Sequence, residues 1–316
     1  MIGIRTLHPA PIMAGDTTFE WGSRTYVMGI INVTPDSFSG DGVGKNIDAA
    51  VRQARIFIDA GADILDIGGE STRPGSLPVS AEVEKQRVLP VVEAIAAQTT
   101  APISIDTYKA GVAAAALDAG AHIVNDVWGL RRDPDMAPLV ARRGVPVILM
   151  HNRSRPKDAV QEQRLGGRYA GIEYDDLMED IIRELQESLA CAVEAGIDPN
   201  QIIVDPGIGF GKTLEQNLTL INHIGQLRSL GRPILVGPSR KSFIGYTLNA
   251  PTDERLFGTA AVVALAIAHG ADIVRVHDVG PMADVVRMTD ALVRGSTVPP
   301  RPTSAQHPLT PDPGPH

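Results

Sequence analysis

One short pattern recurs along this chain of 316 residues and constrains its fold more than any other feature. A helix end leads into Gly, then into Ala and a polar residue, and then into an apolar strand that ends in a polar or charged residue. The pattern occurs as DAGADILDIGGE (59–70), DAGAHIVNDVWG (118–129) and AHGADIVRVHDV (268–279), and more loosely as EAGIDPNQIIVDPG (194–207). Repeated units of this kind are typical of a chain in which helices and strands alternate.

The strands in this pattern are continuous apolar runs, which predicts that each is buried on both faces. The clearest run covers residues 27–33 and is interrupted by one polar residue, Asn32. We expect eight strands, at 27–31, 64–67, 103–105, 122–125, 146–150, 202–204, 233–236 and 273–276. Eight helices alternate with them, at 47–60, 81–97, 109–119, 134–143, 174–195, 214–224, 255–269 and 281–294. The alternation predicts the α/β class and a (β/α)8 TIM barrel, with a doubly wound open sheet as the structural alternative.

Three further segments complete the predicted organisation. Residues 1–25 are expected to form a short N-terminal hairpin that covers one end of the barrel, which itself spans 26–294. Residues 295–316 are rich in Pro and lack an apolar period, so we expect a disordered tail. The polar stretch 151–172 is expected to be a mobile loop after the fifth strand.

Composition excludes several classes of protein. A net charge of −8 and a pI near 5.5 argue against binding to nucleic acid, which selects basic surfaces. The most apolar helix candidate, within 259–268, is far too short to span a membrane. Cys191 is the only cysteine, and the N-terminus lacks a secretory signal pattern, so we expect a cytoplasmic protein.

Polar side chains stand at the end of every predicted strand. They are Asn32, Asp66, Asp106, Asn125, His151, Asp205, Ser239 to Lys241, and Arg275 with His277. Because the carboxyl ends of barrel strands form one rim, we expect these groups to share an active site. Carboxylates and amides suit a ligand rich in N–H donors, whereas the cations Arg240, Lys241, Arg275 and His277 suit phosphate or carboxylate. The residues therefore predict a polar heterocycle joined to phosphate, and Asn32 beside phosphate would suit Mg²⁺.

The glycine-rich stretch 205–212, DPGIGFGK, imitates two nucleotide-binding motifs without matching either. Its Gly-Lys-Thr ending resembles a P-loop, but the first glycine of that motif would fall at Pro206. Its alternating glycines do not fit the dinucleotide fingerprint either. We expect them to let the backbone approach a ligand closely around Phe210.

The motifs together resemble the dihydropteroate synthase family, the folate-pathway enzymes that sulfonamides inhibit. The resemblance runs from about residue 28 to residue 293. Its motifs are GIINVTPDSFS (29–39), DIGGESTRPG (66–75), SIDTYK (104–109), IVNDV (123–127), LMHNR (149–153), DPGIGFGK (205–212), GPSRKSFIG (237–245) and RVHDV (275–279). It implies a Mg²⁺-dependent transferase, usually a homodimer, that joins dihydropterin diphosphate to 4-aminobenzoate and releases diphosphate.

The resemblance also implies roles for single residues. The pterin would be held by Asp106, Asn125, Asp205 and Lys241, supported by Asp66, stacked on Arg275 and walled by Val127, Met150 and Phe210. The diphosphate would meet Asn32, Arg275 and His277, and Asn32 would contact Mg²⁺. The aminobenzoate would meet Phe38, Thr72, Arg73, Pro74 and Ser239.

The implied reaction is dissociative, because the cation left after diphosphate departs is delocalised over the dihydropterin. Such a route needs charge stabilisation and exclusion of water by two mobile loops, 34–45 and 71–80. Asp41 is expected to face the cation, although the chain reads Ser-Gly-Asp-Gly (39–42) where the family usually has Ser-Asp-Gly-Gly. The stretch after His151 also departs from the frequent family form and receives no role.

Two other functions are open at this stage. A methyltransferase barrel acting on methyltetrahydrofolate would share Asp66, Asp106, Asn125 and Asp205, but would not need the STRPG and SRK motifs. A non-catalytic pterin-binding paralogue would be expected to lose Asn32, Lys241 or Arg275, and all three are present. Phe38, Thr72, Pro74 and Ser239 are the expected residue types, which predicts sensitivity to sulfonamides.

Overall fold

A computed structural model describes residues 8–33, 43–72, 75–170 and 172–295, and within them eight parallel strands form one sheet. The order is β10-β7-β6-β5-β4-β3-β12-β11, and a parallel bridge between Val204 and Ile234 joins its two edges. The predicted TIM barrel is therefore confirmed. Its strands are β3 (Tyr26–Asn32), β4 (Ile64–Gly68), β5 (Ile103–Asp106), β6 (Ile123–Asp126), β7 (Val147–Met150), β10 (Ile202–Asp205), β11 (Leu235–Val236) and β12 (Ile273–Val276).

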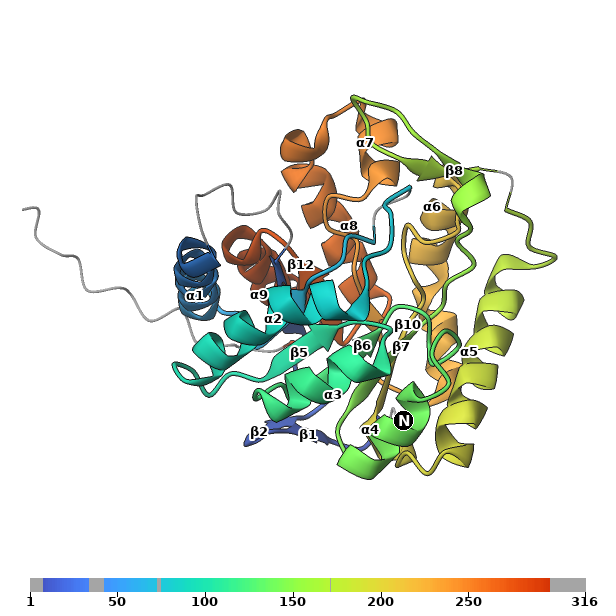
Figure 1. Ribbon diagram of the computed structural model, residues 1–316. Coiled ribbons are helices and arrows are strands. Elements are labelled where there is room, and N and C mark those ends of the chain that lie inside the picture. Colours follow the sequence, from blue (N-terminus) through green and yellow to red (C-terminus); the bar gives the residue numbers. More distant parts are fainter. Residues whose placement is uncertain (1–7, 34–42, 73–74, 171, 296–316) are drawn as a thin grey trace, which may run out of the picture.

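The predicted helices surround this sheet, and Figure 1 shows them around the strands. Side chains cap the first turn of several helices. Ser80 caps the helix that begins at Ala81, Asp176 caps the helix that begins at Leu177, and Thr213 forms a capping box with Gln216 at the helix that begins at Leu214. An additional helix, α7 (Ser242–Leu248), follows β11. The eight expected helices are α1 (Val43–Asp59), α2 (Ala81–Ala96), α3 (Ala110–Asp118), α4 (Met136–Arg143), α5 (Leu177–Glu194), α6 (Leu214–His223), α8 (Leu256–Ala268) and α9 (Val279–Arg294).

The amino-terminal end of the barrel is closed by the predicted hairpin, β1 (Ile12–Ala14) and β2 (Thr17–Phe19). It lies at the bottom of Figure 1, away from α7. Phe19 and Trp21 pack against Tyr26 and against one apolar layer inside the barrel. Every strand except β5 contributes one residue to that layer: Met28, Ile64, Ile123, Ile148, Ile203, Leu235 and Ile273.

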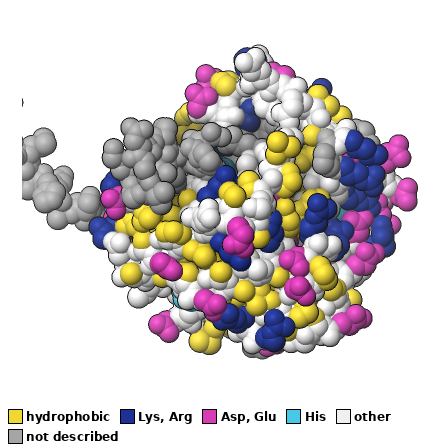
Figure 2. All heavy atoms as spheres, in the orientation of Figure 1, with side chains coloured by type: hydrophobic (Ala, Val, Ile, Leu, Met, Phe, Trp, Pro, Cys, Tyr) yellow, Lys and Arg dark blue, Asp and Glu magenta, His cyan; other side chains and the backbone are white. Residues whose placement is uncertain are grey.

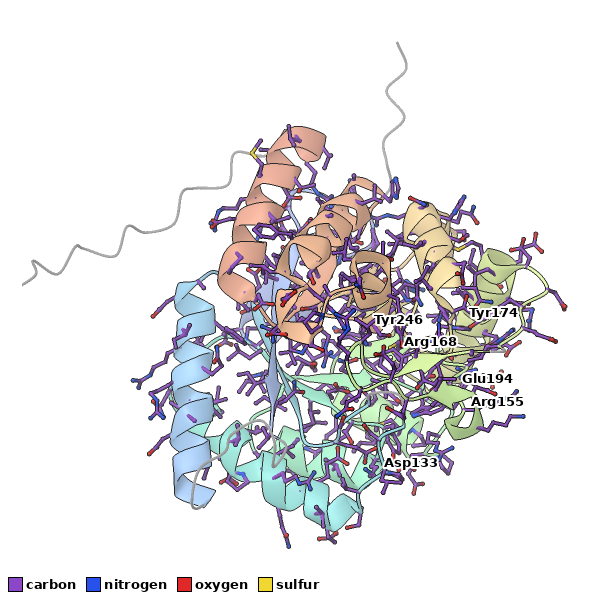
Figure 3. All side chains as sticks on the ribbon, turned by 90° about the horizontal axis from the view of Figure 1, so that it is seen from above. Asp133, Arg155, Arg168, Tyr174, Glu194 and Tyr246 are labelled. Atoms are coloured by element: carbon purple, nitrogen blue, oxygen red, sulfur yellow. The ribbon has the colours of Figure 1, made fainter. Side chains whose placement is uncertain are left out.

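The expected loop after β7 contains more structure than predicted. It forms an antiparallel ribbon of β8 (Ala159–Val160) and β9 (Arg168–Tyr169). The ribbon is anchored on α7, because the Arg168 guanidinium lies 4.9 Å from the centre of the Tyr246 ring and the Tyr246 hydroxyl donates to Gly166. Figure 3 shows Arg168 and Tyr246 close together over the barrel. The loop expected after β7 therefore contains a short ribbon, in which each two-residue strand supplies the other's backbone partners. Its mobility stays a prediction.

The described surface carries charged side chains of both signs (Figure 2). Acidic and basic side chains are mixed on the face shown in Figure 2, unlike the continuous basic surface that nucleic acid selects. Among the described residues, no helix is both long enough and apolar enough to cross a bilayer. The tail expected at 295–316 lies outside the described residues, apart from Gly295.

Candidate active site at the carboxyl end of the barrel

The candidate site lies next to the apolar layer, toward the carboxyl ends of the strands. Residues two apart on a strand point to the same face, so the side chains of both levels point into the barrel. Moving two residues along four of the eight strands replaces a buried apolar side chain by a polar one. Ile123 is followed by Asn125, Ile203 by Asp205 and Ile273 by Arg275. The resulting pocket is lined by Thr72, Asp106, Asn125, Val127, Met150, Asp205, Ile208, Phe210, Gly237, Lys241 and Arg275.

Arg275 connects opposite walls of this pocket through two carboxylates. Its guanidinium donates to Asp66 and to Asp106, each at 2.6 Å. Asp66 is fully buried beneath the pocket and also accepts from the Asn125 amide, at 3.3 and 3.4 Å. A buried carboxylate is costly unless charged or hydrogen-bonded partners surround it, so Arg275 and Asn125 make this arrangement possible.

Two carboxyl groups in the pocket have pKa values that are raised toward neutral pH. Burial raises the pKa of Asp106 to about 7, with Arg275 opposing and Asp66 reinforcing the rise. Burial also raises the pKa of Asp205 to about 6, opposed by its hydrogen bond from the Gly207 N–H and by the nearby cations. Carboxyl groups whose pKa values are strongly shifted, and which lie in a concave site, are candidates for contact with a ligand or for a part in a reaction.

Asp205 is held in place by the glycine-rich loop that follows β10. Its Oδ1 accepts from the backbone N–H of Gly207 at 2.7 Å. Gly207, Gly209 and Gly211 all have positive φ angles, which glycine adopts without strain, and the sequence led us to expect close approach of this backbone to a ligand. The close approach, however, is to protein: a Cβ on Gly207 would lie 1.9 Å from the carbonyl oxygen of His151, and one on Gly211 would lie 2.5 Å from the backbone nitrogen of Ser154.

The apolar wall is the one that the sequence predicted. Val127, Met150 and Phe210 form a buried cluster, with Tyr108 and Trp128 packed against it. The Lys241 ammonium lies 4.0 Å from the centre of the Phe210 ring, which is favourable for a cation. A flat heterocycle would thus meet apolar and cationic surfaces around its faces and carboxylates and an amide at its edge.

Ser239 and His277 form a second unit beside the pocket. The Ser239 hydroxyl oxygen accepts from the His277 N–H at 3.1 Å and lies 3.0 Å from His277 Nδ1. Burial, reinforced by Arg275, lowers the pKa of His277 to about 3, so its ring is neutral. Arg240 forms an ion pair with Asp278 and is absent from the pocket lining, contrary to its place among the predicted cations.

His151 is also outside the pocket, although it was predicted on the rim. Met150 points inward, so the next residue on the same strand points outward. The His151 ring is buried between Lys212 and Glu184. Asn32 is partly buried at the end of β3, while Phe38, Asp41, Arg73 and Pro74 lie outside the described residues.

Several residues near the pocket were not predicted. Ile208 and Gly237 contribute to its lining. Beside Asp106, Lys109 forms ion pairs with Glu70 and with the buried Glu84. The motifs contain both Glu70 and Lys109, but only the packing of α2 against α3 brings Glu84 to them.

The donor set limits how a metal could be held. In the described part of the chain, no three His, Cys, Asp or Glu side chains are grouped to bind a metal. Asn32 offers one amide oxygen near the carboxyl end of β3. This suits Mg²⁺ that arrives with phosphate oxygens and keeps most of its water, and it does not suit a tightly caged metal.

Comparison with known proteins agrees with the geometry. The family model described as "Pterin binding enzyme" matches residues 28–277. The chain is 49% identical to the dihydropteroate synthase of Clostridium beijerinckii, over 89% of this chain and 98% of that protein. It is also similar to the dihydropteroate synthase of Clostridium difficile determined in the presence of pteroic acid, with TM-score 0.80, 46% identity and coverage of 87% and 99%. A Yersinia pestis dihydropteroate synthase in complex with a sulfonamide drug matches with TM-score 0.80, 42% identity and coverage of 90% and 98%.

Proposed function

The chain belongs to the dihydropteroate synthase family of pterin-binding enzymes, and we propose from this how its residues perform the family's reaction. The enzyme is a transferase that joins (7,8-dihydropterin-6-yl)methyl diphosphate to 4-aminobenzoate. The products are 7,8-dihydropteroate and diphosphate. The bond from the methylene carbon to the diphosphate oxygen breaks, the amine nitrogen bonds to that carbon, and the amine loses a proton.

The observation that carries the assignment is the pocket above the apolar layer of the barrel. Asp106, Asn125 and Asp205 line one small space with two carboxyl groups and an amide. A pterin edge carries ring N–H, amino and carbonyl groups, which these side chains complement. We propose that Lys241 donates to the pterin from the side of Phe210, and that Asp66 acts only by supporting Arg275 and Asn125.

Arg275 is proposed to stack on the pterin and to stabilise the departing diphosphate. Its position next to two carboxylates keeps the guanidinium charged and fixed, so little reorganisation is needed when negative charge develops. Asn32 and His277 would contact the same diphosphate. Mg²⁺, held through Asn32, would neutralise part of the leaving-group charge.

Departure of diphosphate before attack is the proposed order of events. The electron-rich dihydropterin delocalises the cation, so the protein needs no strong base to activate the aromatic amine. Its own groups instead hold the ring, balance charge and exclude water. The sequence predicted the first loop to run to residue 45, but α1 begins at Val43. We propose that the segment before α1, which carries Asp41, and loop 71–80 close over the cation before the amine adds.

The aminobenzoate site is proposed next to the pterin pocket. Thr72 lines that pocket from the second loop, and Phe38, Arg73 and Pro74 are assigned to the site by the family motifs. Ser239 would receive the carboxylate by donating its hydroxyl hydrogen, while its oxygen accepts from the backbone N–H of His277.

We further propose a homodimer in the cytoplasm. The described surface of α8 and α9 exposes large apolar side chains, among them Phe257 at 85% and Leu292 at 71%. Burial of such a surface favours association. Sedimentation of the wild type and of Phe257→Asp tests this: a dimer that the substitution splits supports it, and a wild-type monomer contradicts it.

Diphosphate release with Mg²⁺, measured with and without 4-aminobenzoate, tests the function. We expect release that matches dihydropteroate formation. Pterin binding without product would reject the synthase activity. Methyl transfer from methyltetrahydrofolate would then support the methyltransferase, and binding alone would support a non-catalytic paralogue.

A further inference from the structure

A buried lysine behind the pocket has no part in the proposed mechanism. Lys212, at the end of the glycine-rich loop, is only 2% exposed. Its ammonium group donates to the carbonyl oxygens of Gly207 and Phe210, both at 3.0 Å, and lies 3.0 Å from Nδ1 of His151. All three of its hydrogens therefore have a protein partner.

These contacts fix the shape of one loop. The two carbonyl groups lie at either end of the tight turn 207–210, which is also closed by a hydrogen bond from the Phe210 N–H to the Gly207 carbonyl. The Gly207 N–H holds Asp205, and Phe210 carries the apolar wall. Lys212 thus binds the backbone of Gly207, whose N–H holds Asp205, and the backbone of Phe210 itself.

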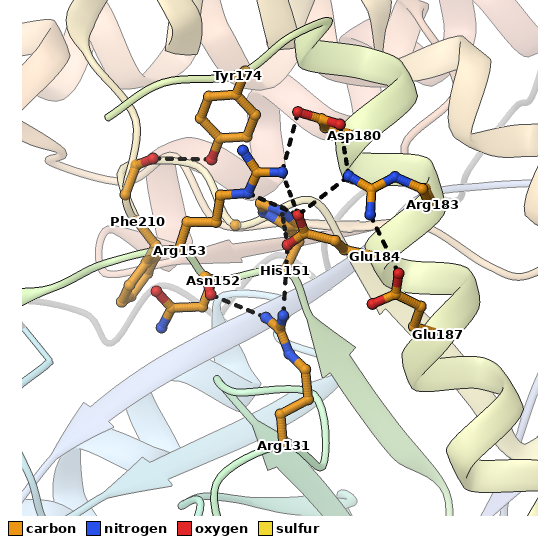
Figure 4. A network of polar contacts seen from close by, with 12 residues as sticks. Arg131, His151, Asn152, Arg153, Tyr174, Asp180, Arg183, Glu184, Glu187 and Phe210 are labelled. Atoms are coloured by element: carbon orange, nitrogen blue, oxygen red, sulfur yellow. Dashed lines mark hydrogen bonds and ion pairs between the residues drawn. The ribbon is translucent and has the colours of Figure 1, made fainter. Parts of the chain in front are cut away.

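Neighbouring residues complete the support of the loop from outside the barrel. Asn217, itself buried, accepts from the Gly209 N–H at 2.6 Å, and the Tyr174 hydroxyl donates to the Gly211 carbonyl at 2.9 Å. Figure 4 shows the Tyr174 contact beside Arg153 and Glu184. Every glycine of the loop therefore has a backbone atom fixed by a side chain.

An ion-pair network holds the histidine that faces Lys212. Nε2 of His151 lies 3.1 Å from an oxygen of Glu184, without the alignment of a hydrogen bond. Arg153 donates to Glu184 at 2.7 Å and also pairs with Asp180 on the same helix, α5. Figure 4 shows Arg131 reaching the same carboxylate from the other side.

The charge state of the pair agrees with this geometry. Burial and the charge of Lys212, opposed by Glu184, lower the pKa of His151 to about 3, so the ring is neutral and its Nδ1 can accept from the ammonium. Burial lowers the pKa of Lys212 to about 7, opposed by Asp205 and Glu184.

We propose that Lys212 is a positioning residue that holds Asp205 and Phe210 in their pterin-binding arrangement through the backbone of loop 205–212. The inference rests on the proposed pterin-binding role of those two residues. Lys212 would act through them without touching the substrate, so its loss should weaken pterin binding and leave the aminobenzoate site unaffected.

The test compares three variants by steady-state kinetics and by calorimetric titration, with 6-hydroxymethylpterin as the pterin probe. Lys212→Met removes the ammonium group at nearly constant length. Tyr174→Phe removes a single hydrogen bond to the same loop. Thr25→Val is the control, because it removes a buried hydrogen bond to Asp290 at the opposite end of the barrel.

We expect Lys212→Met to raise the Kd of the pterin probe by at least about tenfold, and Tyr174→Phe to raise it about threefold. The KM for dihydropterin diphosphate should rise with the Kd, while the KM for the aminobenzoate substrate stays within about twofold of wild type. Thr25→Val should change neither constant, even where it lowers the free energy of unfolding.

A folded Lys212→Met with wild-type affinity would overturn the inference. If that variant does not fold, Tyr174→Phe decides, and an unchanged Kd rejects the proposal. Equal rises in both KM values would also reject it, because they indicate general loosening. A wild type that does not bind the pterin would instead reject the proposed function itself.

Discussion

The guanidinium of Arg275 donates a 2.6 Å hydrogen bond to the carboxylate of Asp106, joining β12 to β5 across the mouth of the barrel. These strands are separated by two others in the sheet, so the bond crosses the pocket. The bond would couple the two roles proposed above, recognition of the pterin edge by Asp106 and charge stabilisation by Arg275. A change in either should affect both.

Arg275→Ala should lower kcat/KM for dihydropterin diphosphate by about a thousandfold or more, because it removes the fixed charge facing the leaving group. It also leaves Asp66, which is fully buried, without its cationic partner. The measurement is a coupled assay of diphosphate release, with circular dichroism to show that the barrel remains folded. Arg24→Ala, which removes an ion pair with Asp63 outside the candidate site, is the matched control. Full activity in a folded Arg275→Ala would contradict the assignment.

The raised pKa of Asp106 predicts how pterin affinity depends on pH. Below about pH 7 the carboxyl group is protonated and loses acceptor capacity. The Kd of the pterin probe should therefore rise as the pH is lowered from about 7.5 to about 5, with Asp205 contributing near pH 6. Titrations with the pterin probe across this pH range test the prediction. In Asp106→Asn, the change of Kd near pH 7 should be smaller than in the wild type. An affinity that is constant or improves as the solution becomes more acidic would contradict the prediction.

Stability should change in the opposite direction, which separates binding from unfolding. The native pKa of Asp106 lies above that of an unfolded Asp, about 3.9. Its contribution to stability is therefore present below about pH 4 and is lost as the pH rises through about 7. Urea unfolding at about pH 5 and about pH 8 should show a smaller difference for Asp106→Asn than for the wild type.

The positions of the strands and of most pocket residues could be predicted from the sequence, because both follow from local patterns. Apolar runs mark the strands. Side chains two residues apart point to the same face, so Asn125 points into the barrel as Ile123 does, and Arg275 as Ile273 does. The same period explains the error at His151, since it follows the inward-facing Met150 and must point outward. Applying it strictly would have removed His151 from the predicted rim.

Other features depend on long-range contacts that no local pattern contains. The pairing of Arg240 with Asp278 removes a cation from the predicted set, and it joins residues 38 positions apart. In the sequence, Lys212 ends the motif DPGIGFGK (205–212) and imitates part of a P-loop, but neither pattern gives it a role. Its three buried partners come from two separate strand ends, so its role could be recognised only in the folded chain.

A substitution in the hairpin that closes the barrel should lower the free energy of unfolding without changing the activity of the folded enzyme. Phe19 is 2% exposed and packs edge-on against Tyr26 at 4.9 Å between ring centres. Phe19→Ala should lower the free energy of unfolding by about 3–5 kcal/mol, because it leaves a cavity under the apolar layer. The folded enzyme should keep its KM values, since the site is at the other end. Leu77→Ala, at an exposed position, is expected to change stability by less than about 0.5 kcal/mol.

Two glycines with similar backbone angles should respond differently to alanine. Gly207 and Gly231 have φ angles of 71° and 64°, so each substitution places a Cβ in a strained conformation. Nothing lies within 4 Å of the new atom at Gly231, whereas at Gly207 it would meet the His151 carbonyl at 1.9 Å. Gly231→Ala should cost about 1 kcal/mol and leave pterin affinity unchanged. Gly207→Ala must shift the loop, so its Kd for the pterin probe should rise about tenfold. Equal affinities for the two variants would contradict this account.

Sulfamethoxazole should inhibit the enzyme in competition with 4-aminobenzoate. A sulfonamide presents an aromatic amine of the same size to the same position, and Thr72 and Ser239 are among the residues expected to meet it. The apparent KM for the aminobenzoate substrate should rise with drug concentration while kcat is unchanged. The KM for dihydropterin diphosphate is not expected to show this competitive pattern, because we propose a separate space for the pterin, bounded by Asp106, Asn125 and Asp205. Sustained turnover at saturating drug and low 4-aminobenzoate would show that the two ligands do not share a site.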